Sequence, residues 1–271
     1  MIKMLGDSAK LVIYGVSDVG RMREHNEDHI AWDKDMGLVI VADGMGGHNA
    51  GEVASEIAVN SIREALHDVL NPDMQGSHSI ALSDAVREAI CYANDEINRQ
   101  ARENPAYNGM GTTIVLNLFY DDRVIAAHVG DSRGYRLRDD KLEQITTDHS
   151  LVQEMVDNGY LSQEEAQLSA SRNLITRALG IADTVDVDVT ESKVDYGDIY
   201  IMCTDGLTDL VSDEEIVGLL RDHRSETNGC NLEGATEALI ALANDKGGKD
   251  NISVVLVCLQ QAFSDSSGIE D

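Results

Sequence analysis

Cysteine is scarce in this chain of 271 residues, and its four copies lie far apart, at Cys91, Cys203, Cys230 and Cys258. No C-x-x-C pair occurs, so the spacing indicates neither a zinc site nor the disulfide framework of a small secreted domain. Thiols in such an arrangement are typical of a reducing compartment. We therefore expect a cytoplasmic protein.

Basic residues are also few, with 21 lysines and arginines against 49 aspartates and glutamates, a formal charge of −28. Too few positive charges are available to neutralise phosphates, which argues against a nucleic acid or an anionic membrane as partner. Acidic residues are common on any solvated surface, so most of them carry no information about function. Only acidic residues in special sequence contexts are candidates for a site.

Long hydrophobic runs are absent as well. Residues 1–10 lack the apolar core of a signal peptide, and the longest apolar run, residues 252–259, is far too short to span a bilayer. We expect neither export nor membrane insertion. The length and the 42% hydrophobic content suit one domain, which we place at residues 11–261 between a flexible N-terminus (1–10) and a flexible acidic tail (262–271).

Apolar, β-rich runs end in aspartate and glycine at three places, within residues 37–44, 123–131 and 198–206. These are typical of strands that carry carboxylates at their ends. Aspartate pairs at 121–122 and 139–140 supply hairpin turns, and consecutive hairpins indicate antiparallel sheet. Further strands are expected at residues 11–16, 113–120, 135–138, 141–145, 185–189 and 252–259.

Helices are expected in pairs between the runs of strands. This grouping favours an α+β fold, with helices packed outside antiparallel sheets, over an alternating βαβ fold. Residues 150–172 look different, because they combine a short helix with a capping box of Ser162 and Glu165, and we expect a small helical insertion. The paired helices are predicted from apolar spacing and caps at residues 53–69, residues 82–97, the segment after the capping box of Ser212 and Glu215, and residues 232–245.

The strand-end aspartates suggest a site for a hard divalent cation. Mg²⁺ and Mn²⁺ prefer carboxylate, carbonyl and water oxygens. A strand fixes the aspartate, and a following glycine lets the backbone carbonyl approach the same ion. Asp43-Gly44 and Asp205-Gly206 have this arrangement, and Asp250 precedes a strand from the opposite chain direction. A single Asp-Gly can equally be an ordinary turn.

Taken together, the motifs of this chain resemble those of the PPM family of metal-dependent serine/threonine phosphatases, the type 2C class. The resemblance runs in order from about residue 11 to residue 259, and Met45-Gly46-Gly47-His48 is similar to the bacterial members. The matching residues are Ser17-Asp18-Val19-Gly20 with Arg23 and Asn26-Glu27-Asp28; Asp43-Gly44-Met45-Gly46-Gly47-His48; Gly111-Thr112-Thr113; Gly130-Asp131-Ser132-Arg133; Asp148-His149; Thr176-Arg177-Ala178-Leu179-Gly180; Cys203-Thr204-Asp205-Gly206; and Asp250-Asn251.

The resemblance implies two Mg²⁺ or Mn²⁺ ions per subunit, with a possible third. Asp43 would bridge two ions, Asp205 and Asp250 would complete the first site, and the Gly44 carbonyl would serve the second. Glu27 and Asp28 would also serve the second site, directly or through water. Asp131 would help to hold the third, weaker ion, or would simply cap a strand end. The expected fold is an antiparallel β-sandwich flanked by pairs of helices in α-β-β-α layers, with residues 150–172 as a helical flap.

The expected chemistry is direct hydrolysis. Two ions that share Asp43 would lower the pKa of a bridging water and provide hydroxide near neutral pH. Arg23 would bind the phosphate, since its guanidinium can hold two phosphate oxygens. The general acid stays open: animal relatives have a histidine at the position of Met45, so a metal-bound water is our first choice, and His48 and His149 are alternatives.

The predicted function is therefore a protein phosphatase acting on phosphoserine and phosphothreonine. Two alternatives are a catalytically weak regulatory or binding module on the same fold and a phosphomonoesterase for small molecules. Phosphorylated proteins are the expected partners, with a cognate serine/threonine kinase as a further candidate, and we expect a monomer. The flap would contribute to substrate selection.

Overall fold

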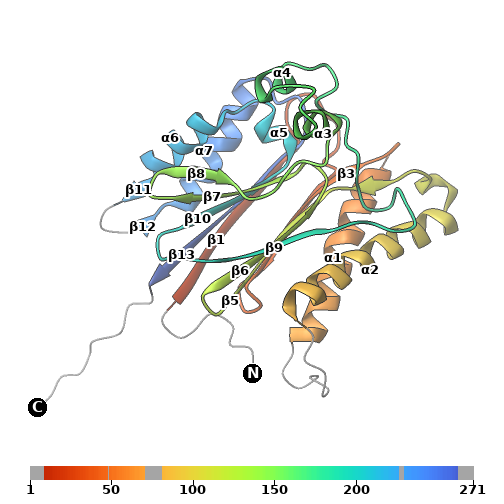
Figure 1. Ribbon diagram of the computed structural model, residues 1–271, viewed down its shortest axis with the longest axis horizontal. Helices are drawn as coiled ribbons and strands as arrows, with labels where there is room; N and C mark the ends of the chain where they lie inside the picture. Colours follow the sequence, from red (N-terminus) through yellow and green to blue (C-terminus); the bar gives the residue numbers. More distant parts are fainter. Residues whose placement is uncertain (1–8, 48, 71–80, 226–228, 262–271) are drawn as a thin grey trace, which may run out of the picture.

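The computed structural model describes residues 9–47, 49–70, 81–225 and 229–261. Two antiparallel sheets lie face to face (Figure 1). The five-stranded sheet has the order β1-β13-β10-β7-β8 and contains the first and last strands of the described chain. Its strands are β1 (Ala9–Asp18), β7 (Arg133–Arg138), β8 (Lys141–Gln144), β10 (Ile199–Cys203) and β13 (Ile252–Gln261).

The six-stranded sheet has the order β2-β3-β5-β6-β9, with the short strand β4 paired to β3. Every pairing in both sheets is antiparallel, as the hairpins indicated. The strands of the six-stranded sheet are β2 (Asp28–Asp33), β3 (Leu38–Met45), β4 (Gly111–Thr112), β5 (Ile114–Tyr120), β6 (Arg123–Val129) and β9 (Asp188–Lys193).

Four helices form the outer layers. The pair α1 (Ala50–Leu70) and α2 (Leu82–Glu103) covers the six-stranded sheet, and the pair α6 (Asp213–Asp222) and α7 (Leu232–Asp245) covers the five-stranded sheet (Figure 1). The shorter elements are η2 (Pro105–Tyr107), α3 (Leu151–Asp157), α4 (Gln163–Gln167), α5 (Asp205–Thr208), β11 (Arg224–Ser225) and β12 (Gly229–Cys230).

Three layers of buried apolar side chains hold these elements together. One lies between the two sheets, where the rings of Phe119 and Tyr200 meet edge to face with centroids 5.2 Å apart. A second fills the space between α1, α2 and the six-stranded sheet, and a third lies beneath α6 and α7. Burial of this apolar surface is the main source of stability. The predicted α-β-β-α sandwich is thus confirmed.

The structure confirms the predicted hairpin turns and helix caps, which depend only on residues close together in the sequence. Asp121, Asp139 and Asp140 adopt positive φ angles in the hairpin turns, a conformation that aspartate tolerates better than most residues. Both capping boxes are present, Ser162 with Glu165 and Ser212 with Glu215.

The strand prediction was wrong in position for β9 and missed β2 and the two-residue strands β4, β11 and β12. The strand expected at residues 185–189 runs from Asp188 to Lys193, because β9 is an edge strand whose outer residues are polar and exposed. Val185 and Val187 instead pack onto the core beneath α1 and α2. Strand β2 was not predicted at all, since this edge strand, DHIAWD, has no clear apolar alternation.

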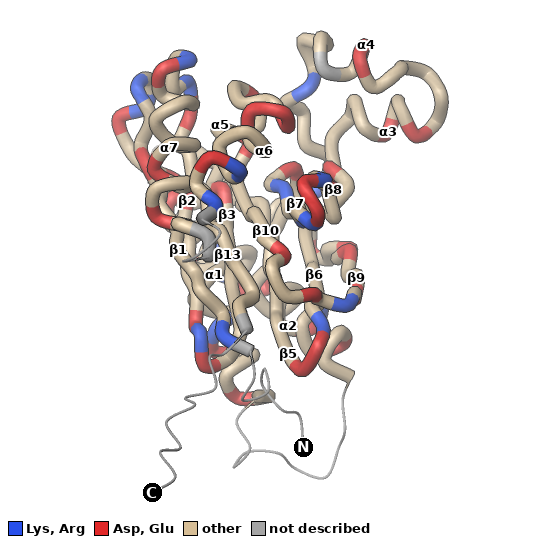
Figure 2. The backbone as a smooth tube through the Cα atoms, turned by 90° about the vertical axis from the view of Figure 1, so that its left-hand side faces the viewer, with Lys and Arg blue, Asp and Glu red and all other residues tan. Residues whose placement is uncertain are grey.

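Residues 150–172 form the expected helical insertion, and its two short helices, α3 and α4, project beyond one end of the sandwich (Figure 2). Ser150 caps α3 by accepting a hydrogen bond from the Gln153 backbone at 3.3 Å. We call residues 150–172 the flap from here on. The predicted flexible ends fall largely outside the described residues, which exclude 1–8 and 262–271.

Candidate metal centre

The predicted aspartates meet at one end of the sandwich, and both sheets contribute. Asp28 on β2 and Asp43 on β3 are direct cross-strand partners. Asp205 begins α5 immediately after β10, Asp250 precedes β13, and Asp131 lies between β6 and β7. All of these carboxylates lie close enough to raise the pKa of Asp43, which burial raises first.

Asp28 links the two sheets. Its Oδ2 accepts hydrogen bonds from Thr204 Oγ1 at 2.9 Å and from Ser253 Oγ at 2.7 Å. Its Oδ1 is buried and has no hydrogen-bond partner within the described chain. Burial raises the pKa of Asp28 to about 7; the two hydroxyls oppose this shift, and the charges of Asp205 and Asp250 add to it.

The backbone of Asp43 is held in place by two threonines. Its N–H donates to Thr113 Oγ1 at 3.1 Å, and its carbonyl accepts from Thr112 Oγ1 at 2.8 Å. The Thr113 backbone N–H donates to the same carbonyl at 2.9 Å. The carboxylate is therefore fixed by the strand rather than by a flexible loop.

Gly44 lies where no side chain fits. A Cβ at this position would lie 2.1 Å from the Gly51 carbonyl oxygen and 2.5 Å from that of Glu27. The Gly44 N–H donates to the same Glu27 carbonyl at 3.1 Å. Burial raises the pKa of Glu27, and this rise is opposed first by the charge of Arg23 and then by a hydrogen bond that the carboxylate accepts from the Gly51 backbone in the first turn of α1. Glu27 and Gly44 are thus brought together beside Asp43.

Asn251 organises the loops around the site, a role that the sequence analysis did not assign. Its Oδ1 accepts from the Glu27 N–H at 2.8 Å, and its Nδ2 donates to the carbonyls of Val19 and His25, each at 2.9 Å. Gly206 packs against its backbone, because a Cβ there would lie 1.9 Å from the Asn251 carbonyl oxygen.

Asp131 and Asp205 are also buried in a negative environment. Burial raises the pKa of Asp131 to about 7, with Asp205 and Asp148 adding to the shift. Burial likewise raises the pKa of Asp205 to about 6, with further contributions from Asp209 and Asp250. Each carboxylate therefore resists ionisation unless a cation is near.

Arg23 lies on the rim of this cluster. Its Nη2 donates to Asp250 Oδ2 at 2.6 Å, and its Nη1 lies 4.0 Å from Glu27 Oε2. The side chain is 47% exposed, so a phosphate arriving from solvent can reach it. Its contacts bring Arg23 together with the predicted ligands Asp250 and Glu27.

The donor set suits a hard divalent cation. The carboxylates repel one another, and the buried Oδ1 of Asp28 has no partner in the described residues. Oxygen donors and an excess of negative charge match the preferences of Mg²⁺ and Mn²⁺. The residues at this end of the sandwich therefore fit the ions that the sequence motifs implied.

A second group of potential ligands lies nearby, where atoms of His128, His149 and Asp188 come within 4.8 Å of one another. A cation already lies among them, because Arg177 Nη1 is 3.2 Å from His149 Nε2 and 3.1 Å from Asp188 Oδ1. His149 Nδ1 accepts from the Gly130 N–H at 3.1 Å, next to Asp131. Burial, His128 and Arg177 lower the pKa of His149. These contacts favour a structural role for His149, whereas His48 lies outside the described residues.

Thr204 and Ser253, the donors to Asp28, were also missed as site residues. Thr204 and Asn251 belong to the family motifs that contain Asp205 and Asp250. Their position next to these aspartates could have identified them as site residues. Ser253 follows two residues after Asn251 on β13 and carries no signal of its own.

Comparison with known proteins gives a consistent result. The family profile described as protein phosphatase 2C matches residues 20–242. The serine/threonine phosphatase stp of Listeria innocua is 38% identical over 248 residues, which cover 89% of this chain and 93% of that protein. No helix among the described residues combines the length and hydrophobicity needed to cross a bilayer.

Two solved structures are also similar. The Mycobacterium tuberculosis serine/threonine phosphatase PstP/Ppp has a TM-score of 0.81 and 37% identity, covering 93% of this chain and 99% of that one. The catalytic domain of the serine/threonine protein phosphatase PstP, in complex with two manganese ions, has a TM-score of 0.79 and 37% identity, covering 93% of this chain and 100% of that one.

Proposed function

Because this chain belongs to the protein phosphatase 2C family, we propose that the aspartate cluster is the metal centre of a serine/threonine protein phosphatase. The reaction is hydrolysis of the phosphate ester on serine or threonine of another protein. The observation that supports it best is the meeting of Asp28, Asp43, Asp131, Asp205 and Asp250 at one end of both sheets.

Two Mg²⁺ or Mn²⁺ ions fit this centre, in keeping with the two manganese ions of the similar PstP structure. Asp43 is close enough to the other aspartates of the cluster for their charges to raise its pKa, and it would be the ligand shared by the ions. Asp205 and Asp250 would complete one site, and Glu27, Asp28 and the Gly44 carbonyl would serve the other, directly or through water. Asp131 is the candidate ligand for a third ion.

When bound, the ions supply the Lewis acid that makes hydroxide available from water near neutral pH. The protein residues fix the donors and bind the substrate. Arg23 would bind phosphate oxygens through its guanidinium, and the ion pair of Arg23 with Asp250 supports this role because it holds the guanidinium beside the carboxylates. Met45 carries no proton to donate and His149 is buried, so a water molecule is the better candidate for protonating the leaving serine or threonine oxygen.

The wider setting follows from the same assignment. We propose that residues 11–261 act as a single phosphatase domain, with the flap at residues 150–172 beside the metal centre, since flap residues line the same cavity as Asp131 and Asp205. The scattered cysteines suit the cytoplasm. We also propose a monomer whose partners are phosphorylated proteins, as the family assignment implies. A serine/threonine kinase with the same targets is the natural counterpart of such an enzyme.

The test is metal-dependent dephosphorylation of a phosphothreonine peptide by the purified protein. Asp43→Asn and Asp205→Asn should each lower kcat by at least about two orders of magnitude, because each removes a charged ligand. Asp68→Asn on the exposed face of α1 is the control and should keep full activity. Activity that persists in EDTA, or in both site variants, would contradict the assignment.

The same assay separates the alternative functions. Rapid hydrolysis of p-nitrophenyl phosphate with none of the phosphopeptide would indicate a phosphomonoesterase for small molecules. Metal binding without hydrolysis of either substrate would indicate a regulatory or binding module.

A further inference from the structure

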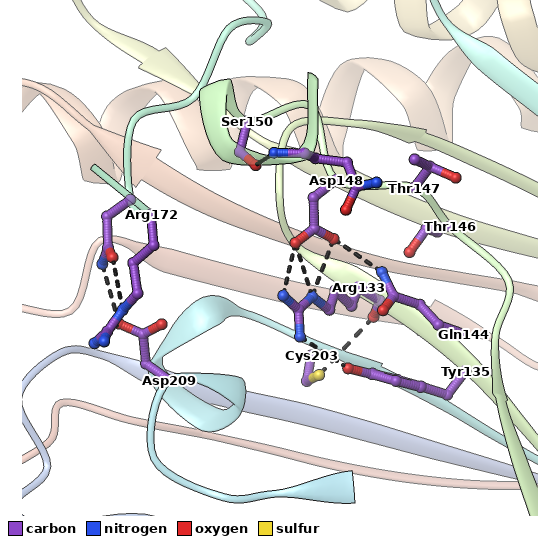
Figure 3. Close-up of polar contacts among 12 residues, drawn as sticks. Arg133, Tyr135, Gln144, Thr146, Thr147, Asp148, Ser150, Arg172, Cys203 and Asp209 are labelled. Carbon is purple, nitrogen blue, oxygen red and sulfur yellow. Dashed lines mark hydrogen bonds and ion pairs between the residues drawn. The ribbon is translucent and has the colours of Figure 1, made fainter. Parts of the chain in front are cut away.

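A cavity of about 540 Å³ opens between the flap and the segment that joins α5 to α6. Asp131 and Asp205 lie in its wall, so the cavity is continuous with the metal centre. Figure 3 shows the polar contacts along it, with Arg133 and Asp148 on one side and Arg172 and Asp209 on the other. A substrate with its phosphate at the metals would place neighbouring residues near this cavity.

The walls of the cavity are partly apolar. Val152 and Ala166 contribute from the flap, and Leu210 and Val211 contribute from the segment before α6. Val152, Ala166 and Val211 are buried. Such walls suit the methylene stem of a long side chain, which can bury its carbons while its head group remains polar.

The charges of the cavity are strongly unbalanced. Pairing accounts for two of its acids: Asp148 binds Arg133 at 2.7 Å, and Asp209 binds Arg172 at 3.3 Å. Asp131 and Asp205 are assigned to the metals. The cavity lining has two further acids, Asp213 and Glu214, and within the described part of the chain neither forms an ion pair. Burial raises the pKa of Asp213, and the charge of Arg133 opposes this rise.

The capping box of α6 is formed by other residues than these two acids. They lie in the first turn of α6, where Ser212 and Glu215 already form the reciprocal capping box. Hydrogen bonds from its own backbone and from Ser212 lower the pKa of Glu214, so it is ionised at neutral pH. The two ion pairs in the cavity wall also show that carboxylates here accept guanidinium groups.

We propose that this cavity is a subsite for a lysine or arginine side chain of the phosphoprotein substrate, with Asp213 and Glu214 binding its charged group. The inference rests on the proposed function, because it assigns the residues that flank the phosphorylated serine or threonine. The formal charge of −28 favours the same class of substrate, since it attracts cationic segments to the enzyme.

The experiment compares matched phosphothreonine peptides. One series carries a single lysine placed in turn at each position flanking the phosphothreonine, and the reference series carries norleucine there, which keeps the carbon chain without the charge. For the wild-type enzyme, kcat/KM should be higher for lysine at one or two positions, by about fivefold at low salt. The advantage should shrink as salt is added.

The test variant is the double substitution Asp213→Asn with Glu214→Gln, which keeps shape and removes charge. It should abolish the preference for lysine and leave hydrolysis of p-nitrophenyl phosphate unchanged. Asp84→Asn is the matched control, because Asp84 is a first-turn acid of α2 in the opposite helical layer and should leave the preference intact. Melting temperatures of all variants show whether each one is folded.

The outcomes separate the two proposals. Metal-dependent hydrolysis without any lysine preference in the wild type overturns the subsite and leaves the proposed function standing. An equal loss on p-nitrophenyl phosphate and on both peptide series also overturns it, because the acids would then serve the metal centre. If no substrate is hydrolysed, the proposed function fails and the subsite fails with it.

Discussion

Asp28 on β2 of one sheet accepts a 2.7 Å hydrogen bond from Ser253 on β13 of the other sheet. Thr204, at the end of β10, donates to the same oxygen. A carboxylate of the proposed metal centre is therefore oriented by both sheets at once. Its other oxygen has no hydrogen-bond partner among the described residues and is available to a ligand.

Ser253→Ala should weaken Mn²⁺ binding by about 10- to 100-fold, because groups that orient a metal ligand contribute on this scale. The hydroxyl lowers the pKa of Asp28, so its loss raises that pKa and favours the protonated carboxyl. Measuring phosphatase activity as a function of Mn²⁺ concentration would give the change in affinity. The control is Ser61→Ala, which changes a buried serine on α1 and should leave Mn²⁺ affinity unchanged.

The metal-free protein should lose stability as pH rises. Asp28, Asp131 and Asp205 have folded pKa values of about 7, 7 and 6, raised from 3.8. An acid with a raised folded pKa favours folding below its unfolded pKa, and this contribution is lost as pH rises through the folded pKa. In EDTA, we expect a melting temperature several degrees higher at pH 5 than at pH 8.

Saturating Mn²⁺ should remove or reverse this trend, since cations stabilise the ionised carboxylates. Thermal melts across this pH range, with EDTA or with Mn²⁺, would measure both effects. A metal-free protein that becomes more stable towards pH 8 would show that the carboxylates are not buried together.

Asn251→Asp should abolish activity and lower the free energy of unfolding by about 3 kcal/mol, because the side chain loses two donors and gains a charge near Glu27. Asn98→Asp is the matched control. Asn98 also donates to two carbonyls, those of Asn94 and Ala182, but it lies on α2. This control should lose stability and keep Mn²⁺ affinity; equal losses of Mn²⁺ affinity in both variants would remove Asn251 from the site.

Asn117→Val should stabilise the protein. Asn117 lies on β5 between Val115 and Phe119 of the inter-sheet core, and neither polar atom of its side chain has a partner in the described structure. Burying such an amide unpaired costs roughly 1–3 kcal/mol, which a strand-compatible valine avoids. Chemical denaturation would measure the gain, with phosphatase activity unchanged.

The contrasting variant is Asn94→Leu. This buried asparagine accepts from the Gly180 N–H at 2.8 Å and donates to the Ala182 carbonyl, so its replacement should destabilise the protein. A destabilised Asn117→Val would mean that the amide does find a partner, such as a buried water.

Sequence patterns predicted the features that depend on neighbouring residues. Asp43-Gly44 follows its strand, and Ser212 with Glu215 begins α6, because the signal and the structure lie within a few positions of each other. Strand β2 was missed and β9 was misplaced, because neither sequence shows a clear apolar alternation. The hydrogen bonds that Thr204 and Ser253 donate to Asp28 could not be predicted. They form only because β10 and β13 are neighbours in one sheet and face β2 of the other.

The placement of Asp28 also bears on how the protein matures. One of its oxygens is oriented by residues from the opposite sheet, and Asp205 and Asp250 lie directly beside strands β10 and β13 of that sheet. A folding intermediate with only one sheet assembled would hold an incomplete set of donors and capture Mg²⁺ or Mn²⁺ weakly. Tight ion binding therefore requires the two sheets to be packed together.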